Sequence, residues 1–158
     1  MHKSLATVVG LLFLAGASSV CAQDKRIGTF QFEKKGSHTA KVIFQARAFD
    51  PSKHKVEYGN FHNRVDGRVA YGAESVPSVE ISSVKFFFQG KRISVPRRLY
   101  SDCYNPNFDS PMFVKMRFSR DLQGVIISMS GADGAGGYEV IWRLRKNGKH
   151  TRSVSEGL

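Results

Sequence analysis

Residues 79–96 read VEISSVKFFFQGKRISVP, and this stretch decides the fold class. A run of β-branched and aromatic residues ends at Gln89-Gly90, and a second short apolar run follows at once. Such residues favour extended strands, and a glycine-containing pair between two runs is typical of a hairpin turn. Residues 79–88 and 91–96 are therefore predicted to form two antiparallel strands.

The same alternation of apolar and polar residues recurs on both sides of this hairpin. In residues 40–49, Val42 and Phe44 alternate with Lys41 and Gln45. A period of two places one face of a strand in the core and the other in water. We expect further strands at residues 27–32, 68–71, 113–119, 125–130, 138–145 and 150–154, with four side chains of the 138–145 strand pointing inward: Tyr138, Val140, Trp142 and Leu144.

This strand pattern predicts an all-β fold. About 7–9 short strands, with turn signals roughly every ten residues, are typical of an antiparallel β-sandwich or a small barrel. The strands at 113–119, 125–130 and 138–145 follow one another through short connections, which predicts an up-and-down meander. Residues 23–158 are long enough to close a core of their own, so we expect one β-rich domain.

Residues 1–22 have the pattern of a cleaved secretory signal peptide. His2 and Lys3 precede an apolar run over residues 5–15, and residues 20–22, Val-Cys-Ala, fit the small-x-small cleavage rule. The apolar run is shorter than the roughly 20 residues that a membrane-spanning helix needs. We therefore expect an exported mature chain, periplasmic or extracellular, without a transmembrane segment.

Positive charge is the second feature that bears on function. The chain has 24 Lys and Arg residues against 13 Asp and Glu residues, a net charge of +11. These residues are spread along the chain rather than gathered in a tail. A field of this sign attracts polyanions, which outside the cytoplasm include lipid headgroups, acidic polysaccharides and nucleic acids. A role in solubility alone is the competing interpretation.

Basic residues alternate outward on two strands of the predicted meander. These residues are Lys115, Arg117, Arg143 and Arg145. In a meander they lie two strands apart on one face, and Lys41 and Arg47 are candidates to extend it. The planar guanidinium fork suits phosphate and carboxylate groups. We predict that these four residues form an anion-binding face, with a merely solvated surface as the alternative.

Cysteine usage excludes an internal disulfide in the mature domain. Cys21 falls within the predicted leader, so Cys103 remains alone. Free cysteine is among the residue types most often buried, and we expect Cys103 to be buried, with an intermolecular bridge or a reactive thiol as the alternatives.

No motif for a metal or another cofactor stands out, and we predict none. The spacing of His54, His62 and Asp66 is not one that strand or helix geometry brings together on zinc. Residues 105–109, Asn-Pro-Asn-Phe-Asp, resemble the start of a calcium loop, but the glycine and the later acidic residue of such a loop are missing.

Three functional hypotheses follow. The sequence favours a non-catalytic binding module for an anionic polymer or lipid headgroup. A structural or protein-interaction role is the first alternative, with an exposed strand edge or the 51–67 loop contacting an envelope protein. A small hydrolase that uses the irregular segments 51–67 and 97–111 is the second.

Overall fold

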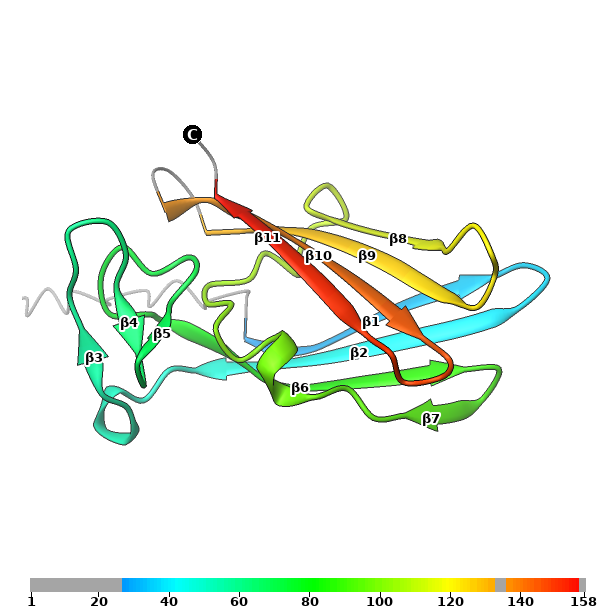
Figure 1. The fold of residues 1–158 in the computed structure, drawn as a ribbon, viewed down its shortest axis with the longest axis horizontal. Coiled ribbons are helices and arrows are strands. Elements are labelled where there is room, and N and C mark those ends of the chain that lie inside the picture. Colours follow the sequence, from blue (N-terminus) through cyan, green and yellow to red (C-terminus); the bar gives the residue numbers. More distant parts are fainter. Residues whose placement is uncertain (1–26, 133–135, 157–158) are drawn as a thin grey trace, which may run out of the picture.

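The computed structural model describes residues 27–132 and 136–156, and their fold is all-β (Figure 1). The leader predicted at residues 1–22 lies outside the described residues. No helix in the described ranges is long and apolar enough to cross a membrane. The strands are β1 (Gly28–Lys35), β2 (Thr39–Ala48), β3 (Val56–Glu57), β4 (Arg64–Val65), β5 (Arg68–Val69), β6 (Val79–Phe88), β7 (Lys91–Ile93), β8 (Val114–Phe118), β9 (Gly124–Gly131), β10 (Tyr138–Arg145) and β11 (Thr151–Glu156), with 3₁₀ turns η1 (Pro51–Lys53) and η2 (Arg97–Leu99).

Two four-stranded antiparallel sheets form the body of the fold, in the orders β1-β2-β6-β7 and β11-β10-β9-β8. The predicted antiparallel sandwich is confirmed, and so is the β8-β9-β10 meander. A small third sheet, β3-β4-β5, lies at one end (Figure 1). Its strands β3 and β4 lie in segment 51–67, which the sequence predicts to be irregular, and β5 falls within the strand predicted at 68–71.

The core lies between the inner faces of the two large sheets. On β10, the four side chains predicted to point inward are all buried. The rings of Phe44 on β2 and Trp142 on β10 lie 5.2 Å apart and join the two sheets. Burial of a side chain as large as Phe44 stabilises the fold by about 2–3 kcal/mol. The alternation in the sequence is thus the pattern of the sandwich core.

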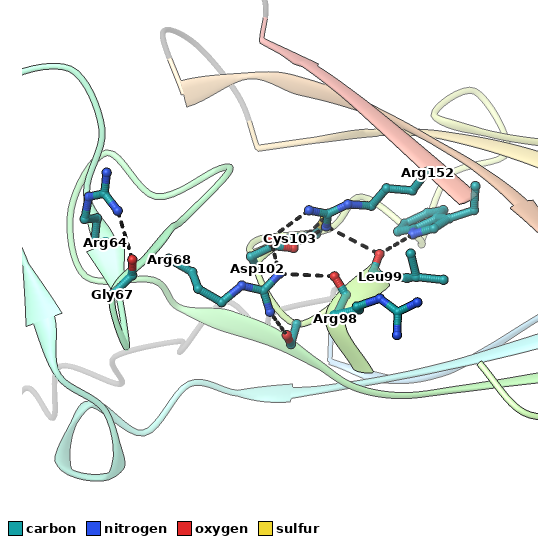
Figure 2. Close-up of polar contacts among 10 residues, drawn as sticks. Arg64, Gly67, Arg68, Arg98, Leu99, Asp102, Cys103 and Arg152 are labelled. Atoms are coloured by element: carbon teal, nitrogen blue, oxygen red, sulfur yellow. Dashed lines mark hydrogen bonds and ion pairs between the residues drawn. The ribbon is translucent and has the colours of Figure 1, made fainter. Parts of the chain in front are cut away.

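An ion cluster around the buried Asp102 carboxylate fixes the η2 turn against the sandwich (Figure 2). Arg152 of β11 donates two hydrogen bonds to the Asp102 carboxylate, and Arg68 of β5 donates a third at 2.6 Å. Cys103 beside them is fully buried, as expected. Trp142 Nε1 donates to the Leu99 carbonyl at 2.7 Å and holds the same turn from the core side. Three strands therefore position residues 97–103.

Candidate functional site

The outer face of the β8–β11 sheet carries the four predicted anion-binding residues. Lys115, Arg117 and Arg143 are exposed, and Arg145 is half-buried. Ile126 of β9 lies directly between Arg117 and Arg143 in the strand register. Because neighbouring strands are about 4.8 Å apart, the backbones of these two arginines are roughly 10 Å apart. The meander therefore places two guanidinium groups in one row.

A shallow hollow lies beside this row. It has a volume of about 290 Å³ and is lined by Ile126, Arg143, Arg145, Lys149 and Thr151, among others. Lys149, in the turn between β10 and β11, adds a cation that the sequence analysis did not select. A ligand seated there meets donors from several side chains at once.

The basic residues of this face differ in their ion pairing. Among residues 27–132 and 136–156, no carboxylate forms an ion pair with Lys115, Arg117 or Arg143. Arg145 instead donates to Asp121 at 2.6 Å. The Ser119 hydroxyl, the Gln123 amide and Arg145 lower the pKa of Asp121 to about 2, so this carboxylate stays charged. Arg145 is thus less available to a ligand than the other three.

The expectation that Lys41 and Arg47 extend this face is wrong. Both lie on β2, which belongs to the other sheet of the sandwich. Arg47 is also paired with Glu80, its Nε donating to Glu80 Oε1 at 2.6 Å. The error arises because local alternation shows that a side chain points outward but does not show which sheet carries it.

The two irregular segments required by the hydrolase alternative meet in a cleft of about 380 Å³. His54 and Asp66 come from the first segment, and the second contributes Arg97, Arg98 and Tyr104. Glu80 of β6 forms part of the same cleft. Glu80 was not among the predicted site residues, and its one sequence signal is a carboxylate flanked by the apolar residues Val79 and Ile81.

Within the cleft, His54 stands between two carboxylates. Its Nδ1 lies 2.8 Å from Asp66 Oδ2, and its Nε2 lies 3.7 Å from Glu80 Oε2. The ring stacks on Phe49 with centroids 4.8 Å apart. The bond from His54 lowers the pKa of Asp66, with help from the Lys55 amide. This arrangement fixes the orientation of the imidazole at the cleft surface.

The other residues considered for metal binding are not brought together. His62 pairs with Glu156 rather than with His54 and Asp66. The Asn105 carboxamide accepts from the Ser78 and Val79 amides and joins two loops. The described part of the chain holds no group of three or more potential ligands arranged for a metal ion.

Comparison with protein-family models, with curated proteins and with solved structures finds no match to this chain.

Proposed function

We propose that the chain is an exported, non-catalytic binding module for an anionic polymer or lipid headgroup in the cell envelope or outside the cell. The ligand contacts the outer face of the β8–β11 sheet. The observation that carries the proposal is the row of Arg117 and Arg143, with Lys115 beside it, without a carboxylate partner in the described residues.

The energetics of such a face favour an extended ligand over a single ion. An exposed ion pair contributes only about 0.2–1 kcal/mol, so one contact does not give stable binding. Bidentate arginine contacts are stronger, and several anionic groups on one polymer or membrane add their contributions. Binding of this kind weakens steeply as salt is added.

A charge-matched pair of variants tests this proposal. Arg117→Ser with Arg143→Ser removes two positive charges from the face, and Lys91→Ser with Arg92→Ser removes two exposed charges from the β6–β7 hairpin. We expect wild type and the hairpin variant to elute from heparin at similar salt, and the face variant to elute earlier. Equal losses in both variants, or binding of wild type to neither heparin nor anionic vesicles at about 50 mM salt, would contradict the proposal.

Vesicles containing anionic phospholipid distinguish the two ligand sources. Cosedimentation with vesicles but no retention on heparin assigns the face to a lipid headgroup, and the reverse assigns it to a polymer. The same two variants serve as test and control in both assays.

Two exposed aromatic side chains favour an envelope-protein partner as a second candidate. Tyr58 is 68% exposed and Phe61 is 93% exposed, and both lie between β3 and β4. Aromatic residues are enriched at the centres of protein interfaces. Capture of an envelope protein that persists at about 0.5 M salt, where exposed charges are screened, and that is lost in Tyr58→Ser with Phe61→Ser, would favour this role.

A further inference from the structure

The Glu80 carboxylate in the cleft has one oxygen without a hydrogen-bond partner in the described residues. The side chain is only 6% exposed. Oε1 accepts from Arg47 Nε at 2.6 Å, whereas Oε2 faces His54 Nε2 at 3.7 Å, beyond hydrogen-bond distance. Among the described residues, no side-chain oxygen or nitrogen that is sealed from solvent lacks a partner, so Oε2 is open to solvent in the cleft. Oε2 is therefore placed to accept a donor from a molecule in the cleft.

Two neighbours add to the hydrogen-bonding capacity of this region. In the neutral tautomer with its proton on Nδ1, His54 donates to Asp66 and its Nε2 is a further acceptor. Burial, together with the nearby Glu80, Asp66 and Asp102 carboxylates, raises the pKa of Tyr104, so its phenol keeps its proton. The cleft thus combines acceptors with one phenolic donor, a set that matches hydroxyl groups.

The same cleft also carries positive charge. Arg97 and Arg98 lie on η2, are exposed, and pair with no carboxylate among the residues that the structure describes. Their backbone is held in place, because Arg68 donates to the Arg98 carbonyl at 3.1 Å and to the Ser101 hydroxyl at 2.7 Å (Figure 2). Guanidinium groups suit a carboxylate, and the fixed η2 backbone places two of them beside the cleft.

We propose that this cleft binds a single acidic sugar residue. The sugar hydroxyls donate to Glu80 Oε2 and His54 Nε2, the Tyr104 phenol donates to a sugar oxygen, and the sugar carboxylate pairs with Arg97 and Arg98. The volume of about 380 Å³ lies within the range of small-molecule sites. None of these residues belongs to the β8–β11 face, so this site is independent of the function proposed above.

Titration of the purified protein with three small probes, followed by amide NMR, tests the inference. Glucuronate carries both hydroxyls and a carboxylate, glucose carries only the hydroxyls, and acetate carries only the carboxylate. We expect saturable shifts around residues 54, 66, 80 and 97–104 with glucuronate. Glucose and acetate should each bind at least about tenfold more weakly than glucuronate. Absence of saturable shifts with glucuronate at about 50 mM, or equal binding of acetate, would overturn the inference.

Variants separate this site from the basic face. Arg97→Ser with Arg98→Ser replaces two exposed residues, and we expect it to weaken glucuronate binding about tenfold without changing the melting temperature. Glu80→Gln keeps the side-chain shape and is expected to weaken binding of glucuronate and glucose alike. The control, Arg117→Ser with Arg143→Ser, is expected to bind glucuronate as wild type does, even if it loses heparin retention. Unchanged glucuronate binding in the Arg97 and Arg98 variant would refute the proposed contacts.

Discussion

Replacement of Asp102 by asparagine is expected to destabilise the fold by about 3–4 kcal/mol, because it leaves a buried arginine without its partner. The Asp102 side chain is 7% exposed and that of Arg152 is 16% exposed. Removal of one partner from such a pair costs about 3–5 kcal/mol. The Arg68 side chain is 42% exposed, so its bond to Asp102 is partly screened by water and adds no more than about 1 kcal/mol.

Urea unfolding measures this loss directly. Trp142 is the single tryptophan of the chain and bonds to the turn that Asp102 fixes, so its fluorescence reports on this region. At roughly 2–4 °C per kcal/mol, the melting temperature of Asp102→Asn should fall by about 10 °C. Asp109→Asn at an exposed position is the matched control and should change stability by less than about 0.5 kcal/mol. A loss below about 1 kcal/mol for Asp102→Asn would show that the pair with Arg152 does not hold this turn in place.

Three further predictions concern pH, packing and thiol reactivity. Burial lowers the pKa of His150 from its ordinary value of 6.5, so the unfolded chain binds more protons than the folded chain near pH 6. The free energy of unfolding should therefore stay constant above about pH 6.5 and fall as the pH drops below it. An unchanged urea midpoint between pH 7.5 and pH 5 would contradict this prediction. Gly124→Ala should cost about 1–3 kcal/mol, because a Cβ there would lie 2.1 Å from the Leu144 carbonyl oxygen, whereas Gly36→Ala, with its nearest atom at 3.5 Å, should melt near wild type. Burial raises the pKa of Cys103 to about 12, so this thiol should react with a disulfide reagent only after unfolding; rapid reaction of the native protein would contradict its placement.

The parts of the fold that were predictable are those set by local pattern. The strands at 79–88 and 138–145 match β6 and β10, because alternation along one strand determines which side chains are buried. Of the β3-β4-β5 sheet, only β5 was predicted, within the strand at 68–71, since β3 and β4 have two residues each and leave no periodic pattern. Its formation depends on tertiary contacts rather than on local sequence.

The candidate sites also differ in how far the sequence alone predicts them. The outward direction of Arg117 and Arg143 follows from strand parity and a short-looped meander, so the sequence was enough to select them. The cleft depends on two loops far apart in the chain, and on Glu80, whose neighbours within β6 are apolar or small. The bond between Asp102 and Arg152 joins residues 50 positions apart, and no local signal marks it.

The salt dependence of binding to a sulfated polymer tests the proposed anion-binding face most directly. Each cation that neutralises an anionic group contributes about one unit to the slope of log affinity against log salt concentration. Removal of the Arg117 and Arg143 guanidinium groups should therefore reduce the slope by about two units, while the Lys91 and Arg92 variant keeps the wild-type slope. The same slope in all three proteins, or an equal reduction in both variants, would contradict a specific role for the β8–β11 face.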